Sequence, residues 1–226
     1  MLKDLINLLF PKQCLHCKQN IDQDFICDEC FKTIKFTNDY LYPTSCQCYL
    51  RLQKDIKIKF GMSMCLFHKK TAIQTLIHEL KYDNKPKIGI WLGKLCGEKL
   101  IHYHFDQDFD FVIPIPLHKK RLQMRGYNQS AMFAKGISET VDKPVYEDII
   151  IRTKNTQTQT TQQRDQRFEN VKDVFEVIKP EKIKNASILL VDDIITTGAT
   201  LISCSKEILK FNPKNLSIIT IATAID

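Results

Sequence analysis

The chain has 226 residues, 43% of them hydrophobic, which suits one domain with a buried core and a small additional module. Its formal net charge of +7 favours a phosphate-bearing partner such as a nucleotide, DNA or an anionic surface. No stretch approaches the roughly 20 apolar residues of a membrane span, so we expect no stable membrane insertion.

The beginning of the chain does not resemble a secretion signal. The apolar run at residues 5–10 is short, and Pro11 and Lys12 follow it where a cleavage site needs small residues. We therefore expect a cytoplasmic protein that is at most peripheral at the inner face of the membrane. In that reducing compartment, clustered cysteines are more often metal ligands than disulfides.

Four of the nine cysteines form two C-x-x-C pairs that nine residues separate, namely Cys14, Cys17, Cys27 and Cys30. This spacing lets four thiolates close a tetrahedral structural site around Zn²⁺, with no position left for a substrate. The alternative is a chance arrangement or disulfide pairing. We expect His16 to be exposed between two of the ligands. The segment before residue 45 has few apolar residues, so the metal should supply much of its stability.

Seven cysteines fall within the first 65 residues, and the pattern changes after them. We therefore predict a zinc-binding module over residues 1–65 and a second domain over residues 66–226. Within the first part, Cys46, Cys48 and Cys65 lack the spacing of a second metal site.

The second domain has the pattern of an α/β fold. Apolar residues at helical spacing predict a helix from Ala72, and a second helix is expected at residues 88–103. Short apolar runs then alternate with helix-like stretches. The runs are at residues 109–115, 149–151, 188–191 and 216–222, and the stretches at residues 128–139 and 201–211. This alternation predicts crossover units and a mostly parallel sheet flanked by helices.

One strand ends in chemistry suited to a sugar phosphate. Asp192 and Asp193 close the apolar run at residues 188–191, where they can accept hydrogen bonds from two vicinal ribose hydroxyls. The phosphate loop, residues 196–200, can wrap a 5′-phosphate with backbone N–H groups at a helix start. Its members are Thr196, Thr197, Gly198, Ala199 and Thr200. Gly198 adopts a positive φ without penalty.

This stretch resembles the phosphoribosyl pyrophosphate motif of type I phosphoribosyltransferases. A strand that ends in two aspartates is common in α/β proteins, and a threonine-capped helix explains part of the pattern. The combination with the phosphate loop makes the motif specific. We therefore expect the seven residues to bind phosphoribosyl pyrophosphate.

A basic segment follows the run at residues 109–115. Residues 111–138 contain five Lys or Arg and no acidic residue, so the segment can hold pyrophosphate or a DNA backbone. Our candidates for these phosphates are Lys119, Arg121 and Arg125. The alternative is a solvated basic helix start. Tyr127 and Phe133 lie among the basic residues and could stack on bases, although core packing suits Phe133 better.

Residues 110–118, together with Arg121 and residues 125–129, resemble the signature of the ComF/GntX family of phosphoribosyltransferase-like proteins. Two further elements of that family are matched in the same order, by residues 80–82 and by Gln163, Arg167 and Asn170. The resemblance implies a type I phosphoribosyltransferase fold behind the zinc module. It also implies a role in natural transformation, with single-stranded DNA and proteins of the competence machinery as partners.

The first functional hypothesis is thus a protein that binds phosphoribosyl pyrophosphate with Mg²⁺ and handles single-stranded DNA. The alternative is an active phosphoribosyltransferase on a nucleobase or nucleotide acceptor. We assign no catalytic base, because His78, Glu79 and His118 are isolated in the pattern. A scaffold organised by zinc explains the cysteines but leaves the phosphate loop without a role.

Overall fold

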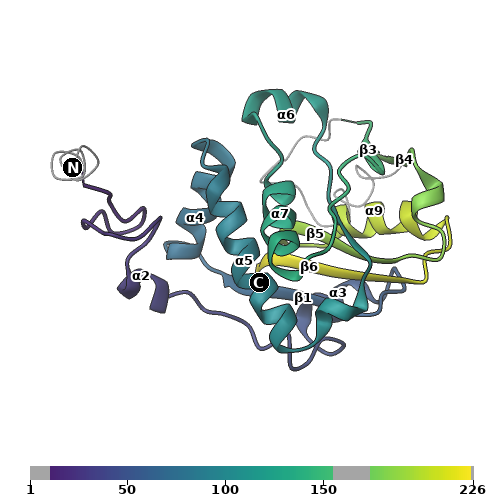
Figure 1. Cartoon of the computed structure of the whole chain (residues 1–226), viewed down its shortest axis with the longest axis horizontal. Coiled ribbons are helices and arrows are strands. Elements are labelled where there is room, and N and C mark those ends of the chain that lie inside the picture. The colour runs from purple at the N-terminus through teal and green to yellow at the C-terminus, as the bar shows by residue number, and fades with distance from the viewer. Residues whose placement is uncertain (1–10, 155–173, 225–226) are drawn as a thin grey trace.

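A computed structural model describes residues 11–154 and 174–224 of the chain. Four parallel strands form the central sheet in the order β1-β6-β5-β2 (Figure 1). Their bounds are β1 (Gly61–Phe67), β2 (Phe111–Pro114), β5 (Ser187–Ile195) and β6 (Asn215–Ala224). A separate antiparallel pair consists of β3 (Ile150–Arg152) and β4 (Phe175–Val177). The expected mostly parallel sheet is confirmed.

The main helices fall where the apolar spacing predicts them. They are α4 (Ala72–Tyr82), α5 (Pro86–His102), α7 (Gln129–Val141) and α9 (Ala199–Leu209). Shorter helices are α2 (Asp28–Lys32), α3 (Gln47–Leu52) and α6 (Lys119–Arg125), with 3₁₀ turns η1 (Phe105–Asp108) and η2 (Pro180–Lys182). No helix in the two described ranges has both the length and the apolar character needed to cross a membrane.

The sheet is buried on both faces. Alternate residues of β5 point to opposite sides, so Leu189 and Val191 pack with α4, α5 and α7, whereas Ile188 and Leu190 pack with α3 and α9. Burial on both sides explains why the strand is a continuous apolar run without a polar face. Because both faces of the sheet are covered, side chains that could contact a ligand are expected at the ends of the strands.

Small residues hold α5 and α7 against each other. Gly89, Gly93 and Gly97 lie on one face of α5, and a Cβ atom at Gly93 would lie 2.2 Å from the carbonyl oxygen of Phe133. From the other side, a Cβ atom at Gly136 would lie 2.1 Å from the carbonyl oxygen of Ile90. The two backbones are thus in direct contact, which fixes the position of α7 beside β5 and β2.

The first strand of the sheet was not expected from the sequence. β1 pairs along its length with β6, as with Met62 beside Ile219. The predicted boundary between residues 65 and 66 falls inside this strand, so part of the sheet lies upstream of it. Figure 1 shows α2 and its flanking loops beyond α4, on the opposite side of the molecule from β3 and β4. The division into two domains itself stays a prediction.

Candidate functional site

The phosphate loop connects the carboxyl end of β5 to the start of α9. Gly198 caps α9 with a φ of 83°, in the left-handed region predicted for it. A Cβ atom there would also lie 3.0 Å from Leu52 Cδ2 of α3. The loop lines a small open pocket of about 40 Å³ together with Asp192, Ile194, Ile195 and Leu201. The five loop residues are therefore gathered around one hollow, at the positive end of the α9 dipole.

Asp192 and Asp193 lie near the carboxyl end of β5, and Asp192 lines this pocket. Asp192 Oδ1 accepts a hydrogen bond of 2.9 Å from Ser130 Oγ at the start of α7. Asp193 Oδ2 lies 2.7 Å from Lys81 Nζ at the end of α4, and both side chains are largely buried. The two carboxylates are thus held by two different helices, in a fixed arrangement before any ligand arrives.

The aspartates differ in their electrostatics. Removal from water and the adjacent charge of Asp193 raise the pKa of Asp192 to about 7, against weaker lowering by the Ser130 hydroxyl and Lys81. Asp192 is therefore only partly ionised at neutral pH. A sugar hydroxyl can accordingly meet either a carboxylate acceptor or a protonated carboxyl group at this position.

The end of α4 brings residues 80–82 to the site. Tyr127, just before α7, donates its hydroxyl proton to the Leu80 carbonyl oxygen. Tyr82 is exposed, and the guanidinium carbon of Arg125 lies 5.2 Å from the centroid of its ring. The sequence offered these three α4 residues only as part of a resemblance, without a role for any of them.

The three basic candidates lie on α6, which projects from the body of the molecule in Figure 1. Lys119 is exposed at the helix start. Arg125 donates to Gln129 Oε1 at 2.8 Å. Removal from water and the neighbouring Arg125 charge lower the pKa of Arg121, an indication of dense positive charge. Gly126 then ends the helix with a φ of 76°.

Two further arginines belong to this region, and the sequence assigned neither of them to the candidate binding site. Arg51 of α3 donates a hydrogen bond to the Thr196 carbonyl oxygen. Arg152 of β3 has its pKa lowered by removal from water and by Arg121, and raised by the charge of Asp192. No local pattern marks either residue, because each comes from an element remote in the sequence. Arg167, Gln163 and Asn170 lie outside the described residues.

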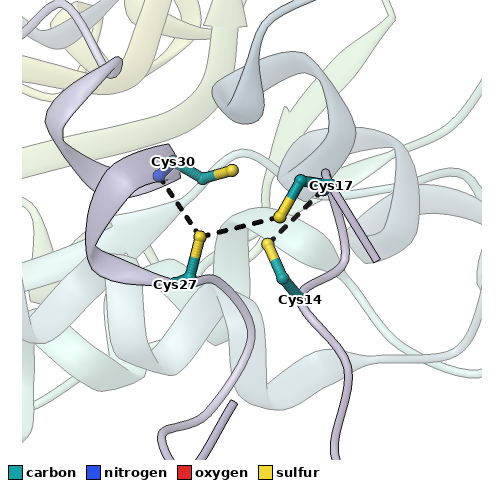
Figure 2. Close-up of side chains that lie close together, drawn as sticks. All are labelled: Cys14, Cys17, Cys27 and Cys30. Carbon is teal, nitrogen blue, oxygen red and sulfur yellow. Dashed lines mark hydrogen bonds between the residues drawn. The ribbon is translucent and has the colours of Figure 1, made fainter. Parts of the chain in front are cut away.

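The four predicted zinc ligands form one cluster. Figure 2 shows the thiols of Cys14, Cys17, Cys27 and Cys30 turned toward a common centre, with the ligand atoms within 4.8 Å of one another. Tetrahedral Zn²⁺ with Zn–S bonds of about 2.3 Å separates two sulfurs by about 3.8 Å, and Cys17 Sγ lies 3.7 Å from Cys27 Sγ. The residues therefore fit a closed structural zinc site.

Backbone donors support the cluster. Cys17 N–H points at Cys14 Sγ (3.5 Å) and Cys30 N–H at Cys27 Sγ (3.4 Å), so both pairs have the same local turn. Burial opposes ionisation of Cys14, but backbone N–H groups outweigh it and lower the pKa of its thiol to about 6, whereas burial and the neighbouring thiols raise the pKa of Cys30. A thiolate is the form that binds metal.

The cluster is attached to the α/β core by its aromatic residues. The rings of Phe25 and Phe31 pack on Trp91 of α5, with centroids 5.7 and 6.0 Å away. His16 is half-buried rather than exposed as we expected, because its Nδ1 atom lies 2.9 Å from Thr75 Oγ1 of α4. The segment that carries the cysteine cluster thus packs against α4 and α5.

The other side chains that we considered have local structural roles. Cys46 donates to the Gly61 carbonyl oxygen, and Cys48 and Cys65 are fully buried.

The three candidate bases also have local partners. His118 accepts from Lys120 N–H at the start of α6. His78 pairs with Asp83 at an exposed position, and Glu79 pairs with Lys85. Within the described residues, none of these contacts orients a base toward the phosphate loop.

Comparison with known proteins adds three relatives and one family model. Residues 128–226 match the model described as phosphoribosyl transferase domain. Competence protein F of Haemophilus influenzae is 27% identical over 230 aligned positions, which cover 95% of this chain and 98% of that protein. DNA utilization protein YhgH of Escherichia coli O157:H7 is 28% identical over 61% of each chain. Competence protein ComFC of Bacillus subtilis is 31% identical over 53% of this chain and 52% of its own.

Proposed function

Because this chain is a ComF-family phosphoribosyltransferase-like protein with a type I phosphoribosyltransferase fold, we propose that it binds phosphoribosyl pyrophosphate and handles incoming single-stranded DNA in natural transformation. The observation that carries the proposal is the pair of adjacent carboxylates near the end of β5, of which Asp192 lines the pocket of the phosphate loop. Ligands of open parallel sheets bind at this edge.

The geometry supports separate contacts for the 5′-phosphate and for the ribose of the ligand. The 5′-phosphate binds to the backbone of the phosphate loop, where Gly198 lets the chain approach closely. The ribose hydroxyls bind to Asp192 and Asp193. The pyrophosphate enters with Mg²⁺, which neutralises part of its charge, and Arg121 and Arg125 supply further positive charge from α6.

The DNA role is supported by the relatives' names and by the basic segment. Two of the three relatives are named for competence and one for DNA utilization. Residues 111–138 carry Lys and Arg without a single acidic residue, which suits a polyphosphate backbone. We propose a cytoplasmic protein, at most peripheral at the inner face of the membrane, to which proteins of the competence machinery would deliver the strand.

Pyrophosphate release distinguishes this proposal from the alternative of an active phosphoribosyltransferase. Turnover breaks the bond between the anomeric carbon and pyrophosphate and joins that carbon to an acceptor. Release stimulated by one base or nucleotide would establish the alternative. Binding of phosphoribosyl pyrophosphate without release, combined with DNA binding, supports the proposal made here.

Removal of both site carboxylates tests the sugar-phosphate site. We expect Asp192→Asn with Asp193→Asn to weaken binding of phosphoribosyl pyrophosphate with Mg²⁺ at least tenfold, about 1.4 kcal/mol, because each amide replaces a carboxyl oxygen that would accept a hydrogen bond from a ribose hydroxyl. Isothermal titration calorimetry measures the change. Glu98→Gln with Asp142→Asn is the matched control, since both residues are exposed at the far ends of α5 and α7. Equal affinities of the two double variants for phosphoribosyl pyrophosphate would contradict the assignment of Asp192 and Asp193 to its binding site.

Salt dependence tests the basic segment. If Lys119, Arg121 and Arg125 contact DNA phosphates, replacing all three by Ala should flatten the logarithmic salt slope by roughly two units, at about 0.7 per phosphate. Fluorescence anisotropy of a labelled single strand between low and moderate salt measures the slope. Phosphoribosyl pyrophosphate should also compete with the strand if both ligands use this surface.

A charge-matched control separates local contacts from net charge. Lys99, Lys184 and Lys214 are exposed and lie away from α6, so their triple Ala variant should keep the original slope. If the α6 variant keeps its slope but loses phosphoribosyl pyrophosphate, the basic residues belong to the small-molecule site alone.

A further inference from the structure

An exposed aromatic ring lies at the edge of the candidate site. Tyr82 ends α4 and is 65% exposed. The preceding residue, Lys81, pairs with Asp193 inside the site. The end of α4 thus places Lys81 against Asp193 and exposes Tyr82 to solvent. A single exposed tyrosine is ordinary on a protein surface, so its neighbours decide what it can do.

The neighbours of the ring suit a nucleic-acid base and its phosphate. Arg125 lies over the ring, and the ring of His78 is tilted against it with centroids 4.9 Å apart. Arg121 is close enough for its pKa to respond to Tyr82. Proteins that bind single strands combine such aromatic platforms with adjacent Arg or Lys, because every base has a stackable face and every nucleotide a charge.

The other aromatic residues near α6 are less available. Phe133 is fully buried, as its core role predicts. Tyr127 is half-buried, and its hydroxyl is engaged with the backbone of α4. Phe175 is buried in contact with Arg152. The stacking role that the sequence suggested for Tyr127 and Phe133 therefore fits Tyr82 better.

We propose that Tyr82 is a stacking platform for one unpaired base of single-stranded DNA, with Arg121 and Arg125 beside the phosphates of that nucleotide. The inference rests on the proposed DNA function and names a contact within it. Charge complementarity argues for a nucleic-acid strand as the occupant, because four of the seven residues of α6 are Lys or Arg. A base on Tyr82 would lie next to the Lys81–Asp193 pair, so the DNA path would pass the mouth of the phosphoribosyl pyrophosphate site.

The test compares Tyr82→Ala with Tyr82→Phe. We expect Tyr82→Ala to weaken binding of an oligothymidylate about 5- to 160-fold, in the range of one stacked base, whereas Tyr82→Phe keeps the ring and the affinity. The salt slope should not change, because stacking neutralises no phosphate. Tyr42→Ala is the matched control, since Tyr42 is 61% exposed and its neighbour Pro43 contacts the start of β1. Anisotropy titrations and circular dichroism provide the affinities and the check of folding.

A strand without bases isolates the contact. An abasic oligonucleotide should bind the wild-type chain and Tyr82→Ala equally well, because it retains the phosphates and lacks the ring partner. The inference would be wrong if Tyr82→Ala bound the oligothymidylate as tightly as the wild-type chain does. It would also be wrong if Tyr82→Ala lost the same affinity for the abasic oligonucleotide as for the oligothymidylate. Either result would leave the DNA function standing. Absence of single-strand binding by the wild-type chain would instead reject the DNA function, and the Tyr82 contact with it.

Discussion

Replacement of Cys14 by Ser should remove about one zinc ion per chain and unfold the segment around the cluster. Three thiolates cannot close the site, and metal binding in small zinc modules contributes on the order of 10 kcal/mol to folding. Elemental analysis of protein purified without chelator measures the metal. Cys46→Ser is the control, because a serine hydroxyl can still donate to the Gly61 carbonyl oxygen.

The single tryptophan of the chain reports on the same event. Trp91 packs against Phe25 and Phe31 of the segment that carries the four clustered cysteines. Release of that segment by Cys14→Ser or by a chelator should expose the indole and shift its emission to longer wavelength. An unshifted spectrum together with an absence of zinc in the wild-type chain would contradict a metal-dependent module.

Replacement of Gly136 by Ala should lower the free energy of unfolding by about 2–3 kcal/mol. The new methyl group would lie 2.1 Å from the Ile90 carbonyl oxygen. The obstacle is backbone, so no rotamer change relieves the overlap and α5 must move away from α7. The better helix propensity of Ala returns only about 1 kcal/mol. Urea unfolding measures the difference.

Lys135→Ala is the control for that experiment. Lys135 precedes Gly136 on the exposed side of α7, so its replacement should change stability by no more than about 0.5 kcal/mol. Equal stability of the two variants would mean that the backbones of α5 and α7 are not in contact in solution.

Periodicity predicted most of the α/β core. The apolar spacing from Ala72 onward predicted the start of α4, because a helix that covers a sheet must repeat its apolar positions every three to four residues. β1 was missed because Cys65 was counted with the cysteine-rich module. Its run of seven residues is apolar enough for a buried strand, but it is too short to distinguish from a linker by pattern alone.

The local geometry of the candidate site was predictable where its residues are consecutive in the chain. Asp192, Asp193 and Gly198 lie in one continuous stretch, and their strand-to-helix turn follows from the sequence. Their partners were not predictable, since Lys81, Ser130 and Arg51 reach the same edge only through the packing of α4, α7 and α3 on the sheet. Strand order and helix placement decide such contacts, and one sequence without its fold does not specify them.

The pairing of β1 with β6 sets the order in which the chain can fold during synthesis. The ribosome makes β1 first among the strands and β6 last, yet the two lie side by side. The sheet of a nascent chain therefore cannot close before residues 215–224 have emerged, and such non-local pairing is slow. The cysteine cluster has no such delay, because its four cysteines lie within residues 14–30 and are all synthesised before β1. Metal capture is thus expected to precede sheet formation, which leaves a zinc-loaded amino terminus with β1 unpaired and open to aggregation until β6 arrives.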